Sequence, residues 1–317
     1  MTAARHCIEA SLAVQRDGGE ATLAVVMATE GSTYVKPGAM ALFAADGRQQ
    51  GWLSGGCLEP EIAERALAAL RQQRLDLMDI DTRSDEELLS GSAVGCRGRL
   101  HLALLPLPLL DGWARLVEDW RARAGALRLS LDADGELHAA VGPRSLQWSL
   151  PGAAPAQDLH ARIEAPPAVA VFGAGPETTV LLPWLRQLGW FTTLVEKRPR
   201  WREQGALADR HLQETPLRAL ADGLDADAVL VMHHHFELDR ETLEALADHP
   251  ADFIGLLGPR RRQQDLFQLL APARREALRA RLRSPIGLKL GGEGPEAIAL
   301  SIAAQLQRWR DDEGATE

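Results

Sequence analysis

The sequence predicts an α/β protein, with a first half of mixed α and β structure and a second half built on a parallel sheet. The second half contains four short apolar runs, at 168–172, 191–196, 227–232 and 252–256. Each run is followed by a stretch of helical periodicity, an alternation typical of a parallel sheet covered by helices. The first half instead includes two short strands separated by a turn, as in a hairpin. The two halves are therefore expected to be different domains.

The first domain is predicted over residues 1–150. Its predicted elements are strands at 22–27, 39–44 and 98–107, helices at 60–73 and 109–124, and a hairpin of 127–131 with 136–141. Residues 151–167 are rich in Pro and Ala and are predicted to be a linker. The second domain then occupies 168–317, and its last helix is expected at 295–307 behind a glycine-rich approach.

Composition limits the function classes. The 317 residues suffice for two domains of ordinary size, and Lys+Arg 35 against Asp+Glu 44 gives a net charge of −9. Such a surface repels nucleic-acid phosphates and anionic lipid. Three Cys are too few for a disulfide framework, the N-terminal stretch has no apolar core of signal-peptide length, and no run of 18 apolar residues occurs. We therefore expect a cytoplasmic protein with reduced thiols that binds neither nucleic acid nor membrane.

A glycine turn follows the first apolar run of the second half. Gly173 and Gly175 lie between a predicted strand and a predicted helix, as in a Rossmann-like dinucleotide fingerprint, and Glu196 ends the next strand, where an acidic residue binds a ribose hydroxyl. Thr178 stands where the third glycine is usual, and Pro176 lies inside the turn. We therefore expect a Rossmann-like fold, while NAD(P) or another nucleotide remains one alternative and a purely structural turn the other.

Three further groups lie near predicted ligand-facing ends of the second domain. Lys197 and Arg198, beside Glu196, could meet a phosphate instead of the ribose. His233, His234 and His235 close the third apolar run, where alternation directs the outer two histidines one way and His234 the other. They form either a ligand-facing loop without metal or a two-ligand metal site. Arg260 opens a run of three arginines at a predicted helix start, which either binds phosphate or is an ordinary solvated face.

The most distinctive string of the first half is Ser54-Gly55-Gly56-Cys57-Leu58-Glu59, directly before a predicted helix. Two glycines allow an anion-binding concavity, and a helix N-terminus favours the thiolate form of a cysteine. Cys57 is therefore expected to be reactive or a ligand, the alternative being a small buried side chain at a tight turn. Glu59 either orients this loop or simply starts the helix.

The other two cysteines differ in setting. Cys96 lies in a second glycine turn, where Arg97 and Arg99 also favour a thiolate. It is far from Cys57 in sequence, so a joint site depends on tertiary proximity. Cys7 lies in an N-terminal stretch of helical pattern, where we expect it to be a packing residue.

Taken together, these strings resemble the XdhC/CoxI family of maturation factors, which serve molybdenum hydroxylases such as xanthine dehydrogenase and carbon monoxide dehydrogenase. The first-half motifs are Gly31-Ser-Thr with Lys36-Pro-Gly38-Ala-Met40, Ser54-Gly-Gly-Cys57-Leu-Glu59 and Gly95-Cys96-Arg-Gly98. The second-half motifs are Phe172-Gly-Ala-Gly175, Met232-His-His234 with Asp239, Phe253-Ile-Gly-Leu-Leu-Gly258, and Pro285-Ile-Gly-Leu288 through Pro295-Glu296-Ala-Ile-Ala-Leu-Ser301-Ile. The sequence departs from the family at Ser54 and Arg97, which replace glycines, and at Pro176-Glu177-Thr178, which replaces His-Val-Gly and weakens the expectation of a nucleotide.

The resemblance implies a non-catalytic maturation chaperone, a homodimer, that binds the molybdenum cofactor (molybdopterin). It implies that the chain protects the cofactor while a cysteine-desulfurase-type donor supplies a terminal sulfur, and then delivers it to an apo molybdenum hydroxylase. Molybdenum with sulfur ligands is soft and prefers thiolate, and glycine-rich N–H groups bind a pterin phosphate. The expected metal ligands are Cys57 and Cys96. The further residues expected around the cofactor are Gly55, Gly56, Glu59, Gly173, Gly175, His234 and Arg260.

Two other functions remain open from the sequence. One is an NAD(P)-dependent oxidoreductase whose second half binds the dinucleotide, although no acid–base pair can be assigned. The other is a scaffold that holds only the target dehydrogenase and a sulfur donor.

Overall fold

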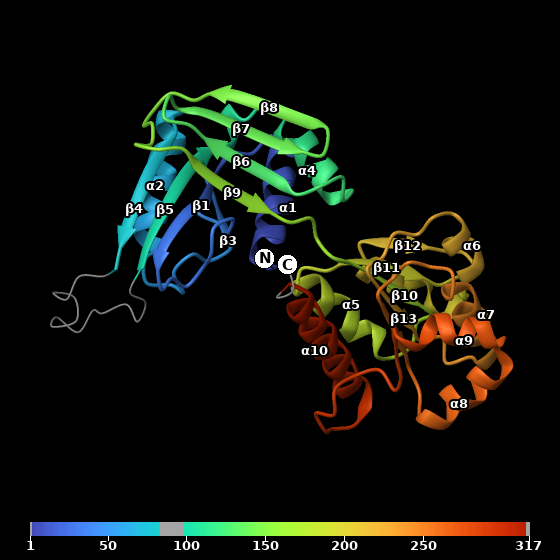
Figure 1. Cartoon of the computed structure of the whole chain (residues 1–317). Coiled ribbons are helices and arrows are strands. Elements are labelled where there is room, and N and C mark those ends of the chain that lie inside the picture. The colour runs from blue at the N-terminus through green and yellow to red at the C-terminus, as the bar shows by residue number, and fades with distance from the viewer. Residues whose placement is uncertain (1, 83–97, 315–317) are drawn as a thin grey trace. The chain divides into compact units, whose positions relative to one another are not determined.

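The computed structural model describes residues 2–82 and 98–314 (Figure 1). The chain divides into two compact units, Met1–Pro166 and Pro167–Glu317, each with its own hydrophobic core. In the ranges described, no helix combines the length and the apolar character that crossing a membrane requires.

The first unit contains two antiparallel sheets. The five-stranded sheet has the order β3-β2-β1-β5-β4, and the four-stranded sheet has the order β8-β7-β6-β9. The strands of the first are β1 (Ala21–Gly31), β2 (Met40–Ala44), β3 (Gln49–Gln50), β4 (Asp76–Asp81) and β5 (Gly98–Pro106). Those of the second are β6 (Leu127–Leu131), β7 (Glu136–Val141), β8 (Arg144–Ser149) and β9 (Leu159–Ile163). The predicted hairpin is the β6–β7 pair.

The five-stranded sheet is buried on both faces. Helix α2 (Glu59–Gln72) packs on one face, while α1 (Thr2–Arg16), α4 (Trp113–Arg121) and the four-stranded sheet cover the other. Strand β2 shows how the sequence achieves this, because Met40 and Leu42 enter one cluster and Ala41 and Phe43 the other. In the amino-acid sequence, a strand that is buried on both faces is a continuous run of apolar residues.

The predicted linker at 151–167 is wrong for its second half. Leu159, Ala161 and Ile163 are buried and alternate with the exposed His160 and Arg162, and the stretch pairs with β6 as strand β9. The alternation is only five residues long and lies among Pro and Ala, so composition hid it. The unit boundary falls at Pro166 instead.

The predicted helix at 109–124 begins four residues late. A short 3₁₀ turn, η1 (Leu107–Leu109), comes first, and Gly112 then adopts φ +80 before the helix starts at Trp113. Strands β4 and β8 have no counterpart among the predicted elements.

The second unit is a parallel six-stranded sheet of order β12-β11-β10-β13-β14-β15, the strand order of a Rossmann fold. Its strands are β10 (Ala168–Phe172), β11 (Phe191–Val195), β12 (Arg210–Leu212), β13 (Ala228–Val231), β14 (Phe253–Leu256) and β15 (Leu282–Arg283). All neighbouring pairs are parallel. The four apolar runs of the sequence are four of these strands, so the predicted fold class is confirmed.

Helices cover both faces of this sheet (Figure 1). Those on one face are α5 (Thr178–Gln187) and α10 (Gly294–Gly314), and those on the other are α6 (Pro216–Ala221), α7 (Phe236–Leu246), α8 (Arg260–Leu269) and α9 (Pro272–Arg279). A nine-residue 3₁₀ segment, η2 (Pro199–Leu207), lies between β11 and β12. Strand order reverses between β10 and β13, and ligands of open α/β sheets bind outside the carboxyl ends of the strands at such a point.

Candidate functional site

The cysteine loop, defined as residues 51–58, connects β3 to α2. Gly55 and Gly56 adopt φ +73 and +110, in a region that favours glycine. Cys57 is exposed and lies two residues before the first residue of α2. The alternative of a buried packing residue is therefore wrong for Cys57, while its reactivity and metal binding stay predictions.

Glu59, the first residue of α2, fixes the cysteine loop through hydrogen bonds to its backbone. Its buried carboxylate accepts hydrogen bonds from the backbone N–H groups of Leu53 and Ser54, each at 2.8 Å, and of Gly56 at 2.7 Å. Burial by itself raises the pKa of Glu59, but the hydrogen bonds from Ser54 and Leu53 outweigh burial and hold this pKa below its ordinary value. Glu59 therefore orients the loop. Its expected place beside a cofactor stays a prediction.

Ser54 completes the same arrangement. Its hydroxyl donates to Glu59 and accepts a hydrogen bond from the backbone N–H of Leu58 at 2.8 Å. The serine that replaces a family glycine thus ties the middle of the loop to its last residue, Leu58, and to the first residue of α2.

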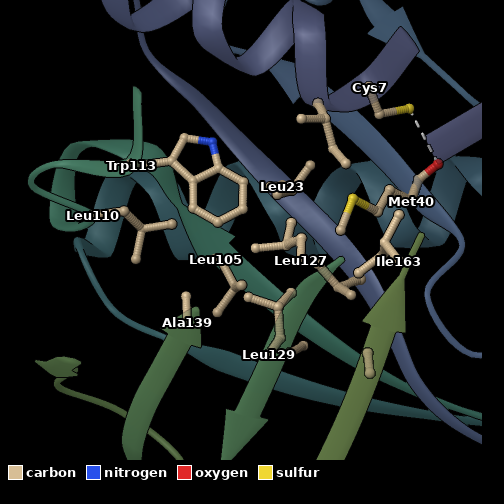
Figure 2. Packing of buried hydrophobic residues seen from close by; sticks show 14 of the residues in the cluster. Cys7, Leu23, Met40, Leu105, Leu110, Trp113, Leu127, Leu129, Ala139 and Ile163 are labelled. Carbon is tan, nitrogen blue, oxygen red and sulfur yellow. Dashed lines mark hydrogen bonds between the residues drawn. The ribbon is translucent and has the colours of Figure 1, made fainter. Parts of the chain in front are cut away.

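The two cysteines within the described residues, Cys7 and Cys57, differ in burial. Cys7 is buried in the core of the first unit, as expected, with its Sγ 3.2 Å from the carbonyl oxygens of Met40 and Gln50 (Figure 2). Burial raises the pKa of the Cys7 thiol to about 12. Cys96 and Arg97 lie outside the described residues. Gly98, where the described chain resumes, lines a narrow cavity together with Ser54 and Leu58 of the cysteine loop.

The glycine turn, defined as residues 173–175, follows β10 in the second unit. Gly173 has φ +88, and a Cβ there would lie 2.4 Å from the Cα of His233, at the end of the neighbouring strand β13. A Cβ on Gly175 would lie 2.7 Å from both Glu177 Oε1 and His234 Nε2. Close backbone packing at the switch point therefore requires a glycine at position 173, whereas at position 175 only the ends of two side chains would have to move.

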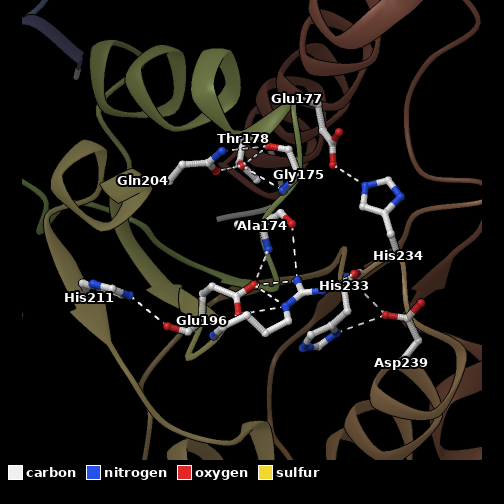
Figure 3. Close-up of polar contacts among 11 residues, drawn as sticks. Ala174, Gly175, Glu177, Thr178, Glu196, Gln204, His211, His233, His234 and Asp239 are labelled. Atoms are coloured by element: carbon white, nitrogen blue, oxygen red, sulfur yellow. Dashed lines mark hydrogen bonds and ion pairs between the residues drawn. The ribbon is translucent and has the colours of Figure 1, made fainter. Parts of the chain in front are cut away.

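All three N–H groups of the glycine turn donate within the protein. Gly173 donates to the carbonyl of Val195 at 3.0 Å. Ala174 donates to Glu196 Oε2 at 2.9 Å and Gly175 to Thr178 Oγ1 at 3.1 Å (Figure 3). A pyrophosphate needs these donors. As arranged, the turn does not fit a dinucleotide.

Glu196, the residue expected to bind a ribose, is bound to Arg198 instead. The guanidinium lies 2.5 Å from Glu196 Oε2 and also donates to the carbonyl of His233 at 2.9 Å. Burial by itself raises the pKa of Glu196, but the hydrogen bonds and charge of Arg198 outweigh it and hold this pKa below its ordinary value. From the sequence, Glu196 and Arg198 are separate ligand candidates, whereas the structure joins them to each other.

The histidines do not alternate as predicted, because His234 adopts φ +54. His233 is buried, and its Nδ1 lies 3.0 Å from Asp239 Oδ1. His234 is half-exposed, with its Nε2 2.7 Å from Glu177 Oε1 (Figure 3). This contact with Glu177 raises the pKa of His234, although partial burial acts in the opposite direction. His235 caps α7 by accepting from the backbone N–H of Leu238.

The arrangement offers no multidentate metal site in the part of the chain described, where no group of three or more His, Cys, Asp or Glu side chains is placed to hold a metal ion. Arg260 is exposed at the start of α8. It is Arg262, two residues later, that reaches the site and binds Asp239 Oδ2 at 2.6 Å.

Sequence reasoning missed the roles of Glu177 and Arg262. The family departure at 176–178 was the available signal for Glu177, since an acidic residue beside a phosphate-binding turn is unfavourable for an anion. No local pattern distinguished Arg262 from its two arginine neighbours.

Comparison with known proteins identifies the family of both units. Residues 14–81 match the XdhC and CoxI family, and residues 169–306 match the XdhC Rossmann domain. A probable xanthine dehydrogenase subunit from Bacillus subtilis is 28% identical over 94% of this chain and 96% of that protein. A shorter match, 33% identical, covers 31% of this chain and 19% of the uncharacterized protein YqeB of Escherichia coli.

A solved structure agrees with these matches. The crystal structure described as a xanthine dehydrogenase from Bacillus halodurans has a TM-score of 0.79 and 27% identity to this chain, covering 96% of each. The cysteine loop lies in the region matched by the first family description, and the glycine turn in that matched by the second. On its sequence, its fold and these two matched regions, the chain belongs to the XdhC and CoxI family.

Proposed function

We propose that this protein is an accessory factor of a xanthine-dehydrogenase-type enzyme, and that it binds the molybdenum cofactor as cargo. In this proposal the chain catalyses no reaction. It shields the cofactor while a cysteine-desulfurase-type donor supplies a terminal sulfur, and then releases it to the apo molybdenum hydroxylase in the cytoplasm. Family membership and two relatives named for xanthine dehydrogenase support the choice of partner.

The single observation that carries the proposal is the exposed thiol of Cys57 on a loop fixed by Glu59. A thiolate is a preferred ligand for a soft metal centre. Because the loop is held by buried hydrogen bonds, the thiol is presented without the entropy cost of ordering the chain around it. Cys96 is the second thiol of the proposal.

The cysteine loop has few free donors for the phosphate of the pterin, because the N–H groups of Leu53, Ser54, Gly56 and Leu58 already donate to Glu59 or Ser54. In this proposal the phosphate lies beside its two glycines. Gly55 and Gly56 are exposed and have no side chains to exclude an anion, and the N-terminus of the 14-residue helix α2 follows directly. In the glycine turn of the second unit all three N–H groups already donate within the protein, and residues 167–317 contain no cysteine that could supply a thiol beside them. We therefore assign the cargo to the first unit and no NAD(P) site to the second.

The test is cofactor retention. The protein is co-produced with the enzymes that make the cofactor and passed through gel filtration, which also reports whether it is a homodimer. Molybdenum and the fluorescent oxidation product of the pterin are then measured per chain. We expect Cys57→Ala to lose most of the molybdenum and Cys7→Ala, which removes a buried thiol elsewhere, to keep it. Cys96→Ala is expected to lower retention as well.

Equal molybdenum in the Cys57→Ala and Cys7→Ala proteins would contradict the thiol assignment. If Cys57→Ala still matured its target dehydrogenase at the wild-type rate, the scaffold function would be favoured instead.

A further inference from the structure

Two aromatic side chains are exposed beside the cysteine loop, and they are exceptional in this chain. The sequence holds eight Trp, six Phe and one Tyr, and all of them fall within the described ranges. Of these, only Tyr34 and Trp52 are strongly exposed, at 60% and 57%. Every other aromatic residue is buried or half-buried.

Both rings lie against the glycines that precede Cys57. The Tyr34 ring is 3.5–3.7 Å from the position of a Cβ on Gly55, and the Trp52 ring is 3.9 Å from that of a Cβ on Gly56. Tyr34 comes from the loop between β1 and β2, whereas Trp52 belongs to the cysteine loop itself. Two separate segments thus bring their exposed rings to consecutive glycines, next to an exposed thiol.

An exposed aromatic face is costly unless it serves an interaction, because burying such a ring removes a large apolar area from water. Isolated exposed side chains need no explanation, but clustering at one loop does. Tyr and Trp side chains bind planar heteroaromatic rings by stacking, as they do nucleic-acid bases.

We propose that Tyr34 and Trp52 form a stacking site for a planar fused heteroaromatic ring, the pterin of the cargo. This inference rests on the proposed function, and it assigns recognition of the organic part to the two rings and of the metal to the thiol. Because Gly55 and Gly56 have no side chains, the two aromatic rings lie directly against the loop, and the ligand would stack on their exposed faces.

The test uses a probe without metal or dithiolene, pterin-6-carboxylate, added to the full chain and followed by fluorescence anisotropy. Trp52→Leu and Tyr34→Leu are each expected to weaken binding about tenfold, in the range of one lost stacking contact. Trp52→Phe restores an aromatic face and is expected to stay within about threefold of wild type. Leu217→Ala removes an equally exposed apolar side chain from the second unit and serves as the matched control, with unchanged affinity expected.

Wild-type affinity in both leucine variants, or no binding of the probe by the wild-type protein, would overturn the inference. So would leucine variants that bind the probe normally but fail to capture the target dehydrogenase, because the aromatic face would then be a protein-docking surface. The probe has no molybdenum, so these outcomes do not depend on the retention measurement with Cys57→Ala. Failure of that measurement alone counts against the proposed function and leaves the stacking result standing.

Discussion

Ser54 and Glu59 are joined by two hydrogen bonds, one from the backbone N–H of Ser54 to Glu59 Oε1 at 2.8 Å and one from its hydroxyl to Glu59 Oε2. Through this pair the first residue of α2 fixes the loop that precedes it. Cys57 lies between the two residues and is thereby held at the surface by the contacts of its neighbours.

Substitution of Glu59 should therefore destabilise the first unit. Glu59→Gln replaces one carboxylate oxygen with an NH₂ group, which donates but cannot accept, so at least one N–H group of the loop loses its partner. We expect a loss of about 2 kcal/mol in the free energy of unfolding, measured by urea denaturation. Glu61→Gln, at an exposed position on the same helix turn, should change stability by only about 0.5 kcal/mol or less. Equal losses in the two variants would show that Glu59 does not hold the loop.

The thiols should react in a fixed order under native conditions. Iodoacetamide modifies thiolates, and Cys57 is exposed while Cys7 is buried with a pKa of about 12. In a Cys96→Ser background, which leaves two thiols, mass spectrometry of peptides should find Cys57 labelled and Cys7 protected until urea unfolds the protein. Labelling of Cys7 at the rate of Cys57 in the folded state would contradict the packing in Figure 2.

His234 should titrate above its ordinary pKa, because its protonated ring is bound to Glu177. A histidine whose folded-state pKa is raised contributes stability that is fully present below its unfolded pKa of about 6.5 and is lost as pH rises through the folded-state pKa. The ring is half-exposed, so the contribution is at most about 1 kcal/mol after solvent screening.

The measurement is an NMR titration of the His234 ring signal in wild type and in Glu177→Gln. We expect the variant to titrate at a lower pH, with the other histidine signals as internal controls. An unchanged midpoint would mean that the pair does not form in solution.

Gly173→Ala should be far more damaging than an alanine at another left-handed glycine. The new Cβ would meet the backbone of His233 at 2.4 Å and would also strain a residue at φ +88. Together these effects are expected to cost about 3 kcal/mol. Gly223 has φ +78 with nothing within 4 Å of its Cβ position, so Gly223→Ala should cost only about 1 kcal/mol. Urea denaturation of both variants tests this, and similar values would refute the close approach of β10 and β13.

NADPH should not bind saturably to the second unit. The donors that a pyrophosphate needs are occupied, and the carboxylates of Glu177 and Glu196 lie beside the turn. Fluorescence titration up to millimolar NADPH is expected to match a buffer blank, with a known dinucleotide-binding dehydrogenase as the positive control. Saturation at micromolar concentration would mean that the turn rearranges, and would revive the oxidoreductase alternative.

Much of the fold could be predicted from local patterns in the sequence. The parallel sheet of the second unit was predictable because each of its longer strands is an apolar run next to a helical period, and both patterns are written in consecutive residues. Strand β9 and the late start of α4 were missed, since five alternating residues among Pro and Ala, and a glycine with positive φ, leave almost no periodic trace.

The candidate site can also be separated into features that local sequence patterns predict and features that they do not. The sequence by itself determined that a cysteine stands after two glycines at a helix start, because neighbours in the chain specify the turn and the helix end, and it determined the family motifs around that cysteine. Only the tertiary structure decided that Arg198 binds Glu196, that Glu177 binds His234, and that Tyr34 and Trp52 meet at one loop. Glu177 and His234, like Tyr34 and Trp52, come from different segments, and which side chains meet across segments depends on strand register and backbone direction, which short-range patterns do not encode. Glu196 and Arg198 are near neighbours in sequence, but their pairing depends on the direction of the backbone after β11.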